Sequence, residues 1–372
     1  MPEAVNAPAP AAEAARVPLP GLDRAALAAA LEELGVPGRQ RRMRTSQIVR
    51  GVFHRGVRDF AALTDLPAAL RARLAARFTL ARPAPMTARH AADGTVKWLL
   101  RLADGREIET VFIPGGGRGT LCISSQVGCT LSCAFCHTGT MPLVRNLSAA
   151  EIVGQVLFAL DELADWPRSG RPRRVTNVVF MGMGEPLFNY EAVATALRIL
   201  LDPEGLGFSR RKVTVSTAGV VPAIDRLGRE LGVRLAVSLH APDDARRDRL
   251  VPLNRKWPLA ELMAACRRYP GGRMITFEYV LLEGVNDAPA DARALRTLLA
   301  DLPAKVNLIP FNPWPGSGFR CPDEARIRRF RRILEEAGIE APVRTPRGRD
   351  ILAACGQLRT AAERARRRRR AA

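Results

Sequence analysis

Thr120–Thr140, TLCISSQVGCTLSCAFCHTGT, holds four of the seven cysteines of this 372-residue chain. Cys122 is followed by Cys129, Cys133 and Cys136 in a C-x3-C-x2-C run. Sulfurs three and four residues apart on a short loop can face the same side, so three thiolates can bind one small inorganic group. Structural zinc normally takes four protein ligands in paired knuckles or with histidines, and iron–sulfur clusters usually take four cysteines. A cluster with three protein ligands would leave one iron open to a substrate or cofactor.

Two other interpretations of these cysteines stay open at this point. The loop could be a degenerate zinc site, although the sequence has no second C-x2-C knuckle and its four histidines are scattered. The thiols could also be buried side chains without any ligand.

The charge of the chain indicates a polyanionic partner. Lys and Arg number 57 against 37 Asp and Glu, which gives a net charge of +20, and such an excess favours nucleic acid. Arg364 and the five arginines of 366–370 could neutralise several phosphates. An arginine-rich genome and a solvated tail are the alternatives for this segment.

Nothing in the sequence predicts membrane insertion or export. No run approaches the ~20 apolar residues of a membrane helix, and residues 1–22, rich in Ala and Pro, have neither a basic start nor an apolar core. Cysteines grouped as ligands suit a reducing compartment better than a disulfide framework. We therefore expect a cytoplasmic protein.

The residues before the cysteine loop predict a small basic helical domain and a hairpin. Asp23 precedes Leu27, Leu31 and Leu34 at helical spacing, and Gly35 closes that helix. Further short helices, dense in arginine, extend to about residue 78. Strand-like residues at 97–102 and 107–113 then flank an Ala-Asp-Gly turn.

From about residue 121, apolar strand-like runs alternate with amphipathic helices. The runs are 122–127, 175–181, 212–216, 234–239, 274–282 and 305–309. Between the first two, Ser148 and Glu151 form a capping box in front of a helix. Six such repeats predict an α/β fold with a parallel sheet, curved into a partial barrel.

Chemistry in such folds gathers at the carboxyl ends of the strands. Gly184-Glu185-Pro186, Ser216, Ser238 and Asn312 each follow or end a predicted strand. Any one of them could be an ordinary turn residue. Together they offer the backbone access and the hydrogen-bonding groups that an amino acid and a ribose require.

The cysteine spacing, with Phe135 between the last two cysteines, resembles the radical S-adenosylmethionine (radical SAM) superfamily. The segments VFIPGGGRGTLCISSQVGC, MGMGEPLFN, STAGVVP, VSLHAPDD, NLIPFNP and DILAACGQL together resemble the RlmN family of radical SAM adenine-C2 RNA methyltransferases. Pro186 favours this branch over the related Cfr methyltransferases, which modify C8. The resemblance implies a partial (βα)6 radical SAM barrel.

The expected domains follow from this resemblance and from the composition. Residues 1–19 would be a disordered lead, 20–83 a helical RNA-binding accessory domain and 84–114 a β-hairpin connector. Residues 115–345 would form the radical SAM core, and 346–372 a C-terminal segment that carries Cys355 and the basic tail.

The resemblance also implies the cofactors and their ligands. Cys129, Cys133 and Cys136 would bind a [4Fe-4S] cluster whose open iron binds S-adenosylmethionine (SAM) and cleaves it reductively to a 5′-deoxyadenosyl radical. The residues that would bind SAM are Gly184, Glu185, Ser216, Ser238, Leu239, His240 and Asn312. His240 could equally be a packing residue that contributes only its backbone.

Two further cysteines and one carboxylate take roles by resemblance alone. Cys355 would accept a methyl group from one SAM, and a radical from a second SAM would activate it for addition to adenine C2. Cys122 would release the product by forming a transient disulfide with Cys355. Glu109 would accept the C2 proton, although a carboxylate on a hairpin is more often a solvated surface residue.

The expected substrates are an adenosine of the 23S rRNA peptidyl-transferase loop and the adenosine beside the anticodon of some tRNAs. An external electron donor and a thiol reductant would complete the cycle. A C8-modifying enzyme of the Cfr type is one alternative, and an RNA-binding protein with a merely structural metal loop is another.

Overall fold

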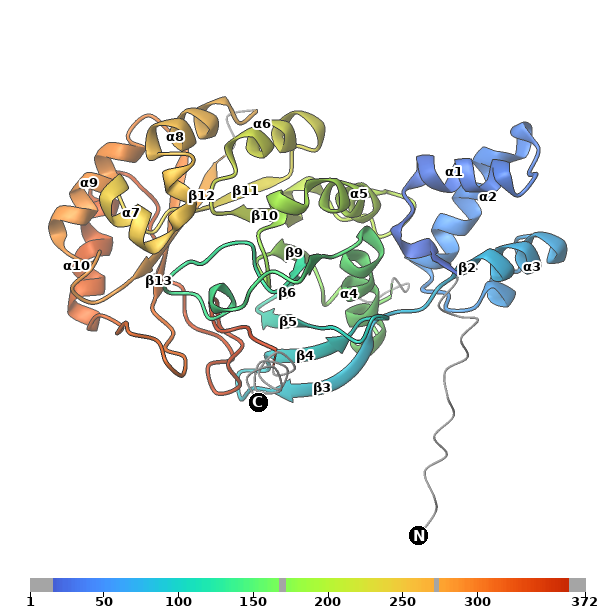
Figure 1. Ribbon diagram of the computed structural model, residues 1–372, viewed down its shortest axis with the longest axis horizontal. Helices are drawn as coiled ribbons and strands as arrows, with labels where there is room; N and C mark the ends of the chain where they lie inside the picture. The colour runs from blue at the N-terminus through green and yellow to red at the C-terminus, as the bar shows by residue number, and fades with distance from the viewer. Residues whose placement is uncertain (1–15, 167–171, 271–273, 361–372) are drawn as a thin grey trace, which may run out of the picture.

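Nine strands form one sheet in the computed structural model, which describes residues 16–166, 172–270 and 274–360 (Figure 1). The order is β13-β12-β11-β10-β9-β6-β5-β4-β3. Their bounds are β3 Ala84–His90, β4 Val96–Arg101, β5 Glu107–Gly115, β6 Arg118–Cys122, β9 Asn177–Phe180, β10 Val213–Thr217, β11 Arg234–Ser238, β12 Ile275–Leu281 and β13 Ala304–Pro310. Two short pairs lie outside it: β1 Val17–Pro18 with β2 Phe78–Thr79, and β7 Gln126–Val127 with β8 Arg145–Asn146.

The six strands from β6 to β13 are parallel, as the alternating pattern predicts. The helices that follow them are α4 Ala149–Glu162, α5 Tyr190–Leu201, α6 Val221–Glu230, α7 Asp244–Leu250, α8 Leu259–Arg268, α9 Pro289–Leu299 and α10 Glu324–Glu335. Figure 1 shows helices α5 to α10 arranged along the outer side of the curving sheet. The predicted mixed α/β architecture is therefore confirmed.

The first of the predicted strands is misplaced. The run 122–127 was expected to be a strand, but β6 ends at Cys122, where it pairs with Val179. The backbone N–H groups of Ser125 and Gln126 both donate to the carbonyl of Met183. The chain therefore leaves the sheet after Ile123 to wrap around the loop that follows β9. Residues 124–126 are polar but buried, and their hydrogen-bond partners include Met183, which lies about 60 residues further along the chain, so the local sequence does not reveal this path.

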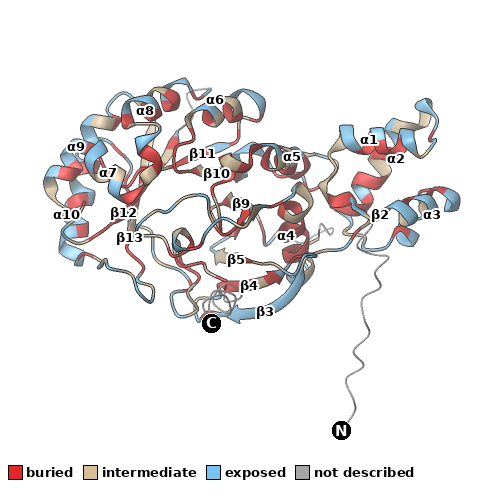
Figure 2. Cartoon of the chain, in the orientation of Figure 1, coloured by how far each residue is buried: buried red, intermediate tan, exposed pale blue. Residues whose placement is uncertain are grey.

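The predicted hairpin is present as β4 and β5, which pair antiparallel from Val96↔Phe112 to Arg101↔Glu107. The strand β3 adds to it on one side and β6 on the other. The hairpin thus continues the parallel sheet. All seven residues of the outer strand β3 are exposed, which Figure 2 shows in pale blue.

Two predicted helix starts are confirmed in detail. The carboxylate of Asp23 accepts a hydrogen bond from Ala26 N (3.0 Å) and caps α1 Arg24–Glu33. Ser148 and Glu151 form the reciprocal capping box of α4, whose residues Ile152 and Val156 are fully buried.

The N-terminal helices α1, α2 Gly38–Val49 and α3 Ala68–Arg77 pack beside α4 and α5 (Figure 1). Arg24 fastens them to the core through Asp202 (2.5 Å) and Glu204 (2.5 Å). The disordered lead was expected to extend to residue 19, but residues 16–19 are ordered: Val17–Pro18 form β1, and Leu19 is fully buried. Residues 1–15 of that lead and the arginine-rich tail from 361 lie outside the described residues. Within the described ranges no helix combines the length and apolarity needed to cross a bilayer.

The C-terminal segment returns across the front of the sheet. Arg344 N donates to Leu308 O (2.8 Å) beside β13, and Gly348 N donates to Asp93 Oδ2 (3.0 Å) in the turn between β3 and β4. The segment therefore runs from one side of the sheet to the other, and it places Cys355 opposite the cysteine loop.

Candidate active site at the carboxyl ends of the parallel strands

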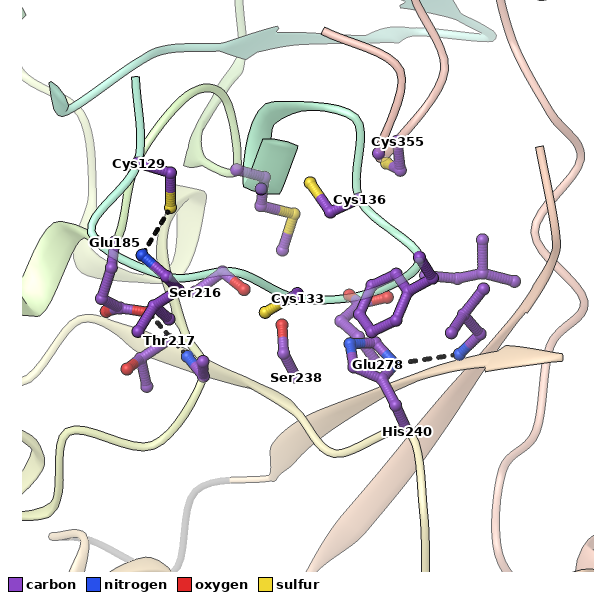
Figure 3. Close-up of a pocket in the computed structure, with 18 of the residues that line it drawn as sticks. Cys129, Cys133, Cys136, Glu185, Ser216, Thr217, Ser238, His240, Glu278 and Cys355 are labelled. Carbon is purple, nitrogen blue, oxygen red and sulfur yellow. Dashed lines mark hydrogen bonds between the residues drawn. The ribbon is translucent and has the colours of Figure 1, made fainter. Parts of the chain in front are cut away.

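A cavity of about 990 Å³, including the part that opens to solvent, lies at the carboxyl ends of the parallel strands. Figure 3 shows the labelled residues around it, with the cysteine loop crossing in front of the strand ends. Of the predicted site residues, those that line it are Cys129, Cys133, Cys136, Gly184, Glu185, Ser216, Ser238, His240, Asn312 and Cys355. Leu239, Cys122 and Glu109 are not among the described residues that line it.

The cysteine loop presents its three thiols to this cavity. Gly128 precedes it with φ +78°, and a Cβ there would lie 2.1 Å from Pro142 O, so only glycine fits. Ala134 N donates to Leu250 O (3.0 Å) and holds the middle of the loop against the end of α7. Burial raises the pKa of the Cys133 thiol well above its ordinary value, and the charges of Cys136 and Cys129 raise it further.

These thiols fit a cluster better than a single metal ion. All seven cysteines are free, and within the described ranges no three His, Cys, Asp or Glu side chains are grouped closely enough to hold one ion. In a cubane each cysteine binds a different iron, so the three sulfurs stand further apart than around one zinc. The raised pKa values keep these half-buried thiols protonated in the absence of a metal, and a cationic cluster core would deprotonate them on binding.

The loop after β9 approaches the cysteine loop closely. Gly184 has φ +97°, and a Cβ on it would lie 2.5 Å from the Gln126 side chain. Glu185 is buried; its Oε1 accepts from Leu187 N (3.0 Å) and its Oε2 from Ala218 N (2.8 Å). Burial raises the pKa of Glu185 to about 7, against the lowering effect of these N–H groups. Glu185 therefore ties the end of β9 to the end of β10.

His240 follows β11 in a left-handed backbone conformation, with φ +59°. Its buried ring accepts a hydrogen bond at Nδ1 from Val280 N (3.0 Å) and packs edge-on against Phe135, with 4.4 Å between ring centroids. Burial lowers the pKa of His240 to about 3, and the charge of Arg247 lowers it further. The ring is therefore neutral, with its proton on Nε2.

Arg247 is a buried residue of this site that the sequence did not single out. Its guanidinium donates to Ala218 O (2.5 Å), Ser238 O (3.1 Å) and Leu239 O (3.1 Å), so it joins the ends of β10 and β11. Burial lowers the pKa of Arg247 to about 10. No sequence signal separates it from its neighbours Arg246 and Arg249.

Leu239 joins this network through its backbone carbonyl, which accepts from Arg247. Its side chain is fully buried and is not among the described residues that line the cavity. Asn312, by contrast, faces the cavity from the segment after β13. It donates through Nδ2 to Cys355 O (3.4 Å) and accepts at Oδ1 from Arg349 Nε (3.1 Å).

Cys355 lines the cavity on the side of Cys136 (Figure 3). Cys122 lies beneath it at the end of β6. Burial raises the pKa of Cys122 to about 12, the charge of Cys355 raises it further and the charge of Arg344 lowers it. The three groups are thus close enough to interact electrostatically.

Arg344 and Glu278 are two more lining residues that the sequence did not single out. The pKa of Arg344 is raised, first by the charge of Cys355 and then, against burial, by Glu278. Glu278 Oε1 accepts from Asn307 Nδ2 (2.9 Å), while Oε2 lies 3.8 Å from Arg344 Nη1. Arg344 therefore places a positive charge between a buried carboxylate and the two thiols.

Glu109 is buried, in contrast to the solvated position that is usual on a hairpin. Its Oε1 pairs with Lys97 Nζ (2.9 Å), and its Oε2 accepts from Arg359 N (2.7 Å). Burial raises the pKa of Glu109, and the charge of Lys97 partly offsets this. It lines a neighbouring cavity together with His137 and Arg359.

Comparison with known proteins shows which family this chain and its site resemble. Residues 123–295 match the family model of the Radical SAM superfamily, and residues 17–80 match that of the ribosomal RNA large subunit methyltransferase N-terminal domain. The dual-specificity RNA methyltransferase RlmN of Methylobacterium radiotolerans is 58% identical over 95% of this chain and 89% of its own length. The chain belongs to the RlmN family. The resemblance and the radical SAM fold inferred from the sequence are confirmed.

Other RlmN proteins and one solved structure agree with this. The RlmN of Caulobacter vibrioides is 58% identical over 94% of the chain and 87% of its own length, and that of Parvibaculum lavamentivorans 55% over 96% and 93%. The crystal structure of a radical SAM methyltransferase from Sphaerobacter thermophilus superposes with a TM-score of 0.85 at 50% identity, over 92% of this chain and 99% of that one. Membership of the superfamily implies a [4Fe-4S] cluster and SAM as cofactors.

Proposed function

We propose that this RlmN-family chain is a dual-specificity RNA methyltransferase that adds a methyl group to C2 of adenine in 23S rRNA and in tRNA. The observation that supports it best is the position of Cys355. This thiol comes from the C-terminal segment, yet it lines the same cavity as the three motif cysteines and the loop after β9. A methyl carrier needs that position, between the site of radical formation and the entering base.

In this proposal Cys129, Cys133 and Cys136 hold the [4Fe-4S] cluster. When bound, the cluster supplies the electron that cleaves SAM and so provides the radical that activates the methyl group on Cys355. The lining hydroxyls of Ser216 and Ser238 can each donate and accept hydrogen bonds to the amino acid and ribose parts of SAM.

The remaining predicted SAM ligands act in different ways. Glu185 is held in place by the backbone N–H groups that its two carboxylate oxygens accept, and each oxygen keeps a second lone pair that can accept from the amino group of SAM. His240 contributes a neutral ring whose Nε2 is a hydrogen-bond donor. Leu239 contributes backbone only, while Gly184 permits the close approach of the loop and Asn312 orients the Cys355 backbone.

Cys122 is the resolving thiol in this scheme. Its thiolate attacks the Cys355 sulfur, the bond between that sulfur and the carbon on the base breaks, and this carbon takes up a proton to become the methyl group of the released product. The raised pKa of Cys122 means that it is protonated at rest, so it must lose a proton before it attacks. The nearby charge of Arg344 favours that loss. The resulting disulfide needs an external thiol reductant.

Glu109 is the proposed proton acceptor. Both of its oxygens are engaged in this structure, one by Lys97 and one by the backbone of Arg359. Each oxygen keeps a second lone pair that can accept the proton, and the positive charge of Lys97 lowers the basicity of the carboxylate.

Two cysteine variants test the function. Cys355→Ala is expected to retain SAM binding and cluster content but to leave no methyl on RNA, whereas Cys122→Ala is expected to trap a covalent protein–RNA adduct on a denaturing gel. Cys321→Ala is the matched control, because this thiol lies outside the residues that line the cavity, and it should behave as wild type. Methylation by Cys355→Ala would refute the carrier role.

Nucleoside analysis of RNA from a strain that lacks the gene identifies which carbon of adenine is methylated. We expect 2-methyladenosine to disappear from 23S rRNA and tRNA. Loss of 8-methyladenosine would instead indicate a Cfr-type enzyme. Zinc with four ligands in anaerobically purified protein would indicate a structural metal loop.

A further inference from the structure

His137, the residue after the last motif cysteine, contacts the Cys355 segment with both ring nitrogens. Nδ1 lies 3.3 Å from Gln357 O and Nε2 lies 2.9 Å from Arg359 Nη1. A guanidinium carries only donors, so Nε2 must accept and Nδ1 must donate to the carbonyl. The ring is buried and stacks on Trp314, with centroids 4.6 Å apart and planes 6° apart.

The cysteine loop adds two more contacts to the same segment, one from its backbone and one from a side-chain hydroxyl. His137 N donates to Gly356 O (2.7 Å), and Thr138 Oγ1 donates to Leu358 O (2.6 Å). Together with the ring, these bonds engage three successive carbonyls, those of residues 356 to 358, which directly follow Cys355.

The loop after β13 closes this arrangement from a third side. Trp314 Nε1 donates to Phe135 O (3.0 Å), and Gln357 Nε2 donates to Pro313 O (2.7 Å). The cysteine loop, the loop after β13 and the C-terminal segment are therefore interlocked, and the His137 ring lies where all three meet.

We propose that His137 is a positioning residue that holds segment 354–359, and with it Cys355, against the cysteine loop. The importance of Cys355 in this inference rests on the proposed function, whereas the anchoring itself does not. A ring that served only as packing would tolerate His137→Phe, which can keep the stacking on Trp314 but loses both nitrogens. A positioning residue would not tolerate it.

Hydrogen exchange on the full-length, anaerobically reconstituted protein tests the anchoring without RNA. We expect the amides of residues 350–360 to exchange about tenfold faster in His137→Phe and in Arg359→Gln than in wild type. The double variant should exchange as His137→Phe does, because that change already removes the contact with Arg359 together with the one to Gln357 O. Arg359→Gln also leaves the residues beside the metal ligands untouched, so its iron content should be that of wild type.

His90→Ala, on the exposed strand β3, is the control and should exchange as wild type. Wild-type exchange in both His137→Phe and Arg359→Gln would overturn the proposal. Additive effects in the double variant would also overturn it, because the two side chains would then act separately.

A second measurement links the anchoring to the reaction. With a chemical reductant in the assay, we expect the ratio of SAM cleaved to methyl groups on RNA to rise about tenfold in Arg359→Gln, with the Kd of SAM unchanged. Loss of cluster would lower both quantities together, so an unchanged ratio would refute the positioning role. If wild type itself leaves no methyl on RNA, the proposed function fails, and the exchange data still decide the anchoring.

Discussion

His240 is the residue whose protonation should be visible in the stability of the whole protein. Its folded-state pKa of about 3 lies below the ordinary 6.5, so the unfolded chain binds more protons between these values. The contribution of His240 to stability is then fully present above pH 6.5 and is lost as the pH falls toward 3. Between pH 8 and 5.5 this one group should remove about 1.4 kcal/mol from the free energy of unfolding.

We therefore expect His240→Asn to unfold with a weaker dependence on pH. Asparagine tolerates the left-handed conformation and can accept from Val280 N, but it does not titrate. Urea unfolding at pH 8 and 5.5 should show a difference smaller by about 1.4 kcal/mol than in wild type. An unchanged difference in His240→Asn would mean that the folded protein binds a proton on the buried ring as readily as the unfolded chain does.

At this scale the sequence reveals residues with an unusual chemistry or spacing. The three motif cysteines, Glu185 and Cys355 could be recognised because their motifs are specific. Arg247 could not, since it stands in a run of charged residues on α7 and only the fold shows which arginine turns inward. His137 could have been noticed from its place beside Cys136, but not its partners, which are more than 200 residues away.

At the scale of elements, Arg247 joins two strand ends, and its removal should affect both stability and cofactor binding. Arg247→Met would leave the carbonyls of Ala218, Ser238 and Leu239 buried without this donor, at about 1–3 kcal/mol for each group left unsatisfied. We expect a loss of about 3 kcal/mol or more in urea unfolding of the cluster-free protein. The Kd of SAM should rise in the reconstituted protein, because Ser238 and His240 follow the same strand.

The control for this prediction is Arg249→Met, an exposed arginine on the same helix, which should change stability by less than about 0.5 kcal/mol. Equal behaviour of the two variants would show that the strand ends hold their places without Arg247.

Helices and strands could be predicted from the sequence where the spacing of their apolar residues was regular. The capping box of α4 and five of the six parallel strands follow from periodicity and flanking residues. The strand before the cysteine loop did not, because residues 123–127 are as fully buried as a strand although they leave the sheet, and Ser124, Ser125 and Gln126 find their hydrogen-bond partners outside it. The local sequence also did not predict that the hairpin joins the parallel sheet through β6, since the pairing of strands depends on residues far apart in the chain.

At the scale of the whole molecule, the net charge of +20 predicts RNA binding that weakens steeply with salt. The exposed Arg39 and Arg42 of α2 lie at one end of the molecule (Figure 1). If this end contacts RNA, replacing both by glutamine should reduce the slope of log K against log salt by about 1.4 to 1.8. Binding of tRNA measured from 50 to 300 mM KCl would provide the slope.

Arg293 and Arg296 on α9 are the matched pair for this test. They are exposed, have the same spacing and lie at the opposite end of the molecule (Figure 1). Glutamine at these two positions should leave the slope unchanged. An equal reduction from both pairs would show that binding follows overall charge and not the N-terminal helices.

The long return of residues 341–360 across the sheet also bears on biosynthesis. The barrel strands and the cysteine loop leave the ribosome before the thiol proposed to carry the methyl group, and domains generally fold from the N-terminus during synthesis. A nascent chain could thus complete its barrel while it still lacks the means to modify a base. A chain that has not yet reached Cys355 would therefore be unable to methylate ribosomal RNA, including that of the ribosome on which it is being made.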